Sequence, residues 1–124
     1  MSTPLPRRVL SPHLQVYRLP FNAWVSILHR ITGVLWSVAL LAATALLWML
    51  AGGADAVKIV SWLATAAGQA LLFVLVFALM FHWAAGLRHL LLDLGWGFSA
   101  PWPTRSAWLV PVVALAGTVL AWVL

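Results

Sequence analysis

The sequence predicts an all-α membrane protein with three transmembrane helices, and three observations support this fold class. Hydrophobic residues make up 65% of the 124 residues, and charged residues make up only 7%. A soluble domain of this composition would have an apolar surface and would aggregate, so the solvent that suits the chain is lipid. Three apolar stretches reach the length of about 20 residues that crosses a hydrocarbon core. The length limits the chain to one small helical bundle, a single transmembrane domain over residues 1–124.

The predicted spans follow an N-terminal segment over residues 1–21 and cover about 22–51, 59–92 and 106–124. Asn22 follows Pro20 and is a candidate N-cap for the first helix. The second stretch is longer than a bilayer requires, so it is expected to tilt or protrude. The short turn GGADAVK and the linker GWGFSAPWPTR separate the spans, because glycine and proline interrupt helices.

The basic residues predict the orientation of the spans. They lie mostly before the first span and around the second loop: Arg7, Arg8, Arg18, Arg30, Arg88 and Arg105, with Lys58 alone in the first loop. The positive-inside rule therefore places the N-terminus and the second loop in the cytoplasm, and the C-terminus outside. The N-terminal segment lacks the apolar core of a secretory signal and the composition of a transit peptide, which favours a bacterial inner (cytoplasmic) membrane.

Composition also excludes several classes of function. The net charge is +5, but the charges flank apolar runs and set orientation, so no nucleic-acid partner is expected. The chain contains no cysteine and therefore supplies no disulfide, no thiolate ligand for a cluster and no c-type haem attachment.

Two groups of polar residues interrupt the apolar spans and are predicted to converge near the cytoplasmic side. The first span carries Ser26, His29 and Arg30 within two turns. The second carries a stripe at steps of four, three and four residues: His82, Gly86, His89 and Asp93. Ionisable groups inside spans are costly, so these groups are expected to face protein, a cofactor or a wet cavity.

Residue counts place the imidazoles at different depths. The second span leaves the membrane around Asp93, so His82 lies roughly 16 to 20 Å inward at about 1.5 Å per residue. On the same scale, His29 lies only about 10 Å past Asn22. His13 and His89 fall at or outside the boundary.

Two interpretations of His82 stay open from spacing alone. It hydrogen-bonds a carbonyl of a neighbouring helix, or it is an axial ligand of a b-type haem, which requires neutral imidazole. Gly86 would let either a flat macrocycle or a second helix approach closely. If haem is bound, His29 is too shallow to face His82 through one iron, and the second ligand is expected from another subunit. His29 and Arg30 would then lie near the haem edge, where an arginine can hold a propionate.

Arg30 and Asp93 likewise each have two interpretations. Arg30 either snorkels to lipid phosphate or joins Ser26 in binding a quinone carbonyl, where both would stabilise negative charge that develops during reduction. Asp93 either caps its helix together with His89 or takes part in proton uptake from the cytoplasm.

Three sequence blocks resemble a known family. LSPHLQVYR at 10–18, SILHRITG at 26–33 and HWAAGLRHLLLDLG at 82–95 occur in the order and spacing of the cytochrome b membrane-anchor subunit of succinate dehydrogenase, which is respiratory complex II. The resemblance extends over nearly the whole chain. The combination of blocks is specific, and one mild departure from the family pattern is the short first loop GGADAVK.

The resemblance implies one half of a heterodimeric membrane-anchor bundle, in which two three-helix subunits hold one haem b. It implies a flavoprotein subunit that oxidises succinate and an iron–sulfur subunit that passes electrons to ubiquinone at the membrane. His82 matches the family's axial haem ligand, with the second axial histidine supplied by the partner anchor. Ser26 and Arg30 match the quinone-site residues, and His29 matches a histidine near the haem propionates. Asp93 matches a residue suspected in proton uptake.

Two alternative functions would require different properties of the chain. A haem-free structural anchor would show no Soret absorbance in the purified complex. A small multidrug-type transporter needs a buried carboxylate, whereas Asp55 and Asp93 lie in a loop and at the end of a span. The chain has no nucleotide-binding fingerprint and no cluster ligands, so its catalytic contribution is expected only at the quinone pocket.

Overall fold

The computed structural model describes residues 16–99 and 101–124, and within them the chain is helical without strands. The helices are α1 (Phe21–Ala51), α2 (Ala56–Leu63), α3 (Ala66–Asp93) and α4 (Trp102–Val123). Helices α1, α3 and α4 are long and apolar enough to cross a membrane. The predicted all-α membrane class with three long helices is therefore confirmed. Most of the predicted N-terminal segment, including Arg7, Arg8 and His13, lies outside the described residues.

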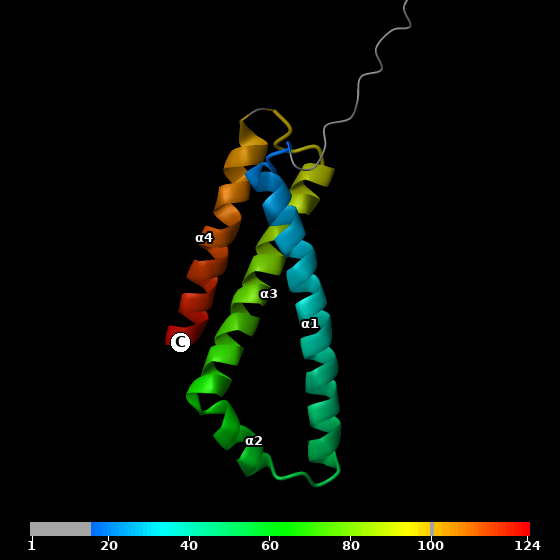
Figure 1. Ribbon diagram of the computed structural model, residues 1–124, viewed down its shortest axis with the longest axis vertical. Helices are drawn as coiled ribbons and strands as arrows, with labels where there is room; N and C mark the ends of the chain where they lie inside the picture. The colour runs from blue at the N-terminus through cyan, green and yellow to red at the C-terminus, as the bar shows by residue number, and fades with distance from the viewer. Residues whose placement is uncertain (1–15, 100) are drawn as a thin grey trace, which may run out of the picture.

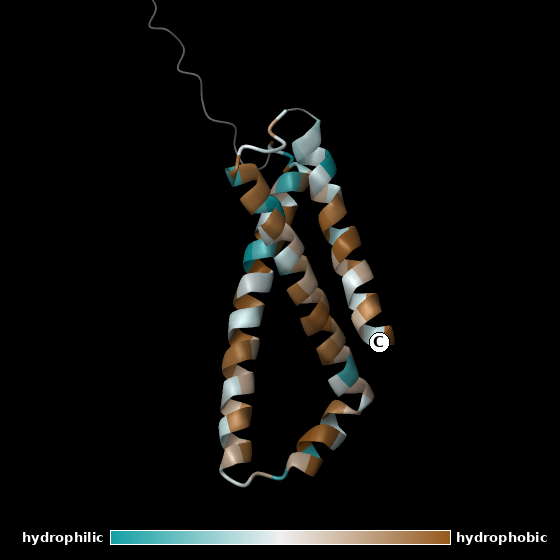
Figure 2. Cartoon of the chain, turned by 180° about the vertical axis from the view of Figure 1, so that it is seen from behind, coloured by the Kyte–Doolittle hydropathy of each residue, from teal (hydrophilic) through white to brown (hydrophobic). Residues whose placement is uncertain are grey.

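Helix α3 packs against both α1 and α4 and holds the bundle together (Figure 1). The start of α1, the end of α3 and the start of α4 meet at one end of the molecule, which we call the polar end. Most of the hydrophilic segments of the long helices lie toward this end (Figure 2). Toward the opposite end, which we call the loop end, α1 and α3 diverge and α2 bridges them.

Helix α1 begins two residues earlier than an N-cap at Asn22 predicts, so the assignment of Asn22 as N-cap is wrong. Pro20 occupies the N-cap position with φ −66° and ψ 157°, and its carbonyl accepts from the amide of Ala23 at 3.0 Å. The proline ring fixes φ near the value that helix entry requires. The ring of Phe21 stacks on Trp108 of α4 with a centroid distance of 3.8 Å, which draws Phe21 into the first turn.

The segment assigned to the second span is divided into α2 and α3. Thr65 stops α2 and caps α3, because its hydroxyl accepts from the amide of Gly68 at 3.2 Å and donates to the carbonyl of Trp62 at 2.6 Å. The excess length of this stretch is thus taken up by an elbow. Whether the membrane crossings follow the predicted bounds stays a prediction.

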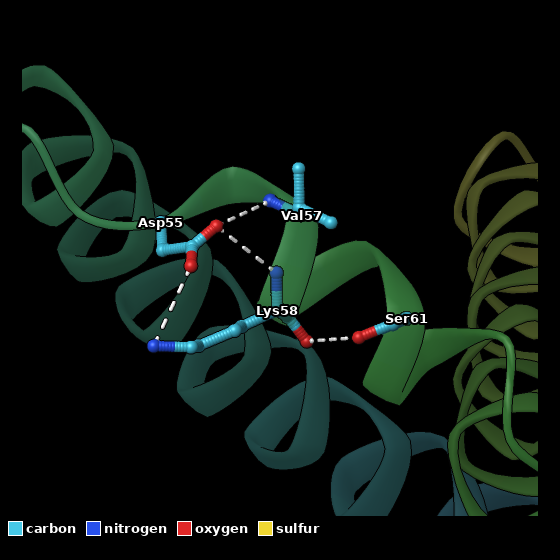
Figure 3. A network of polar contacts seen from close by, with 4 residues as sticks. All are labelled: Asp55, Val57, Lys58 and Ser61. Atoms are coloured by element: carbon cyan, nitrogen blue, oxygen red, sulfur yellow. Dashed lines mark hydrogen bonds and ion pairs between the residues drawn. The ribbon is translucent and has the colours of Figure 1, made fainter.

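Helix α2 starts inside the predicted turn GGADAVK. The Asp55 carboxylate accepts from the amides of Val57 and Lys58 at 3.0 and 3.3 Å, and an ion pair of 3.5 Å joins it to the Lys58 ammonium (Figure 3). A carboxylate at the N-cap satisfies amides that have no partner within the helix.

Small residues dominate the core, which lies toward the polar end. Its buried members are Val25, Phe81, Ala85, Ala107, Val110 and Ala114. Alanines at the contact let α3 and α4 approach closely, which is how helices gain packing energy where lipid competes for apolar surface.

Arg88 ties the polar ends of α3 and α4 together. Its Nε donates to the Ser106 hydroxyl at 3.1 Å, and one terminal nitrogen donates to the Pro103 carbonyl at 2.9 Å. The sequence assigned Arg88 only to orientation. Nearer the loop end, the Trp36 indole donates to the Leu75 carbonyl at 3.1 Å and joins α1 to α3.

The elbow between α2 and α3 yields a stability test at Gly68. A Cβ atom there would lie 2.5 Å from the Trp62 carbonyl oxygen and 2.6 Å from the Leu63 Cα. We expect Gly68→Ala to destabilise the protein by about 1–3 kcal/mol, because backbone atoms must shift to admit the methyl group. Thermal denaturation in detergent measures the effect. Gly52→Ala is the matched control, because its nearest atoms lie at 3.4 and 3.6 Å; equal losses in both variants would contradict the steric explanation.

Candidate functional site

Three imidazoles gather where α1 crosses α3, and we call His29, His82 and His89 the imidazole cluster. The His29 ring from α1 stacks on the His82 ring with a centroid distance of 4.3 Å and an interplanar angle of 29°. The His29 ring also lies near the His89 ring, with a centroid distance of 5.2 Å and an interplanar angle of 32°. His82 and His89 of the predicted stripe on α3 therefore face α1, and all three rings are half-buried.

Two glycines make room for this crossing. A Cβ at Gly33 would lie 2.8 Å from Cε1 of His82, so the His82 ring occupies the space that a side chain at position 33 would fill. Gly86 faces Nε2 of His29, which would lie 3.5 Å from an added Cβ. On each of the two helices, a glycine thus lies opposite a histidine ring of the other helix. The contact is closer at Gly33 than at Gly86.

The orientation of the His82 ring is set by a hydrogen bond between the helices. Its Nδ1 lies 3.0 Å from the backbone carbonyl oxygen of His29. Because a carbonyl only accepts, Nδ1 carries the proton in this bond, and Nε2 of the neutral ring keeps a free lone pair. A histidine with this arrangement is prepared to bind a metal through Nε2.

His29 has an unsatisfied nitrogen. Its Nε2 is buried and has no hydrogen-bond partner among the described residues. A buried polar atom without a partner is uncommon in proteins and indicates a site that a bound group or water completes.

The depth estimate from residue counts separated His29 and His82 too widely. Their ring centroids are 4.3 Å apart, so they differ in depth by no more than that distance. The counts started from two different assumed boundaries and treated both helices as sharing one axis, whereas α1 and α3 cross at an angle (Figure 1).

The other candidate residues lie around this cluster without joining it. Ser26 is half-buried on α1, one turn toward the polar end from His29 and Arg30. Arg30 is exposed and makes no hydrogen bond or ion pair within the described ranges. Asp93 is exposed at the last residue of α3. Their roles in quinone binding and proton uptake stay predictions.

Sequence reasoning missed Thr32. This residue is 9% exposed, and its hydroxyl lies 2.8 Å from the Leu28 carbonyl, 3.0 Å from the His29 carbonyl and 3.5 Å from Nδ1 of His82. The available signal was its place three residues after His29, which puts it near the same face of α1.

The fold and the cluster together define a class: a small multi-pass membrane protein whose long helices hold half-buried imidazoles near one end. No group of three or more potential ligands for a metal ion occurs among residues 16–99 and 101–124.

Comparison with known proteins identifies the family. Residues 4–122 match the family described as succinate dehydrogenase/fumarate reductase transmembrane subunit, and the chain belongs to this family. It is 34% identical over 119 residues to a succinate dehydrogenase cytochrome b556 subunit of Rickettsia felis, covering 94% of this chain and 92% of the relative. A cytochrome b556 subunit of Paracoccus denitrificans is 42% identical over 109 residues, with 81% and 78% covered. A mitochondrial cytochrome b560 subunit of Sus scrofa is 39% identical over 121 residues, with 92% and 67% covered.

The close contact between Gly33 and the His82 ring gives a test of how α1 and α3 cross. We expect Gly33→Ala to destabilise the assembled protein by about 1–3 kcal/mol, since the methyl group would overlap Cε1 of His82 at 2.8 Å. The thermal unfolding midpoint of the purified protein reports the loss. Gly86→Ala serves as the control, because its methyl group would meet His29 at an ordinary 3.5 Å. A smaller loss for Gly33→Ala than for Gly86→Ala would refute the assigned geometry.

Proposed function

We propose that this chain is the cytochrome b membrane-anchor subunit of succinate dehydrogenase, which binds haem b together with a second anchor subunit and contributes to quinone reduction. The family and the named relatives support the anchor role. The haem and quinone assignments rest on the chemistry of the polar end.

The observation that carries the haem assignment is the 3.0 Å contact between Nδ1 of His82 and the His29 carbonyl. It fixes the tautomer in which Nε2 is the free donor atom, and metal-binding histidines are held in this way by their other nitrogen. In the proposal, His82 would therefore hold the haem iron through Nε2. The buried Nε2 of His29 supplies a second polar contact suited to a propionate.

His29 itself is not the opposing axial ligand in this proposal. Its ring stacks directly on that of His82 at 4.3 Å, which leaves no space between the two rings for a macrocycle. The second axial histidine is therefore assigned to the partner anchor subunit. When bound, haem b would supply a one-electron reservoir.

Ser26 and Arg30 form the proposed quinone-binding pair. They lie one turn apart on α1, and the exposed guanidinium of Arg30 has its donors free within the described chain. A hydroxyl and a guanidinium that donate to one quinone carbonyl would stabilise the negative charge that develops as the quinone is reduced. Asp93, exposed at the end of α3, is the proposed residue for proton uptake, since quinone reduction consumes two protons.

The proposed assembly contains an iron–sulfur subunit that delivers electrons and a flavoprotein subunit that oxidises succinate, with ubiquinone as the acceptor. The membrane is the bacterial inner membrane, with the N-terminus and the polar end on the cytoplasmic side. Arg18, Arg88 and Arg105 all lie at the polar end or beyond it, which fits this orientation.

The haem assignment is tested by His82→Ala in the purified complex. We expect the variant to lose or shift the haem b absorption spectrum, because the axial donor is gone, while succinate oxidation with a soluble dye continues. His89→Ala, which removes an imidazole from the same helix, should keep the spectrum. An unchanged spectrum in His82→Ala refutes the ligand assignment, and an unmutated complex without Soret absorbance favours the haem-free anchor.

The quinone assignment is tested by Arg30→Ala. We expect quinone reductase activity to fall about tenfold or more, as when a donor to a developing oxyanion is removed, while dye reduction stays near the unmutated rate. Arg105→Ala is the matched control, because it deletes an exposed arginine from another helix at the same end. Equal loss of both activities in Arg30→Ala would indicate failed assembly and contradict the proposed role.

A further inference from the structure

Thr32 is a buried hydroxyl that shares an acceptor with the proposed haem ligand. Its Oγ1 lies 3.0 Å from the His29 carbonyl, the same oxygen that Nδ1 of His82 reaches at 3.0 Å. Its contact with Nδ1 itself is 3.5 Å, which is too long for a strong bond. The two side chains are therefore linked mainly through this one carbonyl.

The carbonyl oxygen of His29 can accept only a limited number of hydrogen bonds. Within α1 it belongs to a continuous helix, in which each carbonyl accepts from the amide four residues later. A carbonyl oxygen has two lone pairs, so the helix bond leaves one for both the Thr32 hydroxyl and His82. The hydroxyl has a single hydrogen and a second acceptor, the Leu28 carbonyl at 2.8 Å, so it takes only part of that capacity.

We propose that Thr32 is a positioning residue that weakens the hydrogen bond from His82 to the His29 carbonyl and thereby sets the electron-donating strength of His82 toward haem iron. This inference rests on the proposed function. A ligating imidazole becomes more basic as its other nitrogen donates more strongly, and hydrogen bonding around a haem ligand is one of the means by which proteins tune haem potentials. A more basic ligand favours the ferric state and lowers the midpoint potential.

The test is an optical redox titration of haem b in the purified complex carrying Thr32→Val. Valine keeps the branched shape but removes the hydroxyl, which frees the His29 carbonyl for His82. We expect the midpoint potential to fall, by up to about tenfold in the ferric-to-ferrous ratio, or 59 mV for a one-electron couple. Thr32→Ser keeps the hydroxyl and should titrate like the unmutated protein.

Thr44→Val is the matched control, because the Thr44 hydroxyl donates to the Leu40 carbonyl at 2.8 Å on the same helix, exposed and away from the imidazole cluster. It should leave the potential unchanged. If Thr32→Val does not assemble, Thr32→Ala removes the same hydroxyl with less volume and must show the same downward shift.

Three results would overturn the inference: an unchanged potential in the hydroxyl-free variants, an upward shift, or a Thr32→Ser variant that shifts as they do. These results are separable from a failure of the proposed function, in which the unmutated complex would contain no haem to titrate.

Discussion

The arrangement of the polar end depends on one bond between helices, from Nδ1 of His82 to the backbone carbonyl of His29. This bond joins α1 to α3, selects the tautomer of a half-buried ring and places the rings of His29 and His82 in contact. It forms only because Gly33 leaves the space into which the His82 ring fits. Packing and chemistry are therefore coupled here, since the contact that fixes the helix crossing also prepares a nitrogen for metal binding.

Arg88 and Arg30 differ in whether the described part of the chain provides them with hydrogen-bond partners. Arg88 is half-buried and is satisfied by Ser106 and the Pro103 carbonyl, so it acts as a link between α3 and α4. Arg30 is exposed, and the described residues give it no partner. Membrane-embedded cations are expensive unless they are paired or reach water, which explains the internal partners of Arg88. Arg30 has no such internal partner, and the proposed function uses its exposed guanidinium to bind an external group.

The sequence predicted what depends on composition and periodicity. Three apolar stretches gave the three long helices, and the spacing from His82 through Gly86 to His89 correctly placed those residues on one face.

The sequence did not predict the features that depend on contacts between helices. The Thr65 cap looks like an ordinary polar residue inside an apolar run, and the nearness of His29 to His82 follows from a crossing angle that no residue count contains. Thr32 was missed for the same reason, because its importance comes from a carbonyl that it shares with a residue 50 positions away.

Because α1 and α3 diverge, the loop end of the bundle is packed less tightly than the polar end. At the loop end, the opening between α1, α2 and α3 has a volume of about 740 Å³, and the outer part of α1 is exposed at Leu41, Leu47 and Trp48. Regions with few buried contacts open at the lowest free energy, so local unfolding of the isolated chain begins there. The imidazole cluster lies at the opposite end, where the three long helices meet.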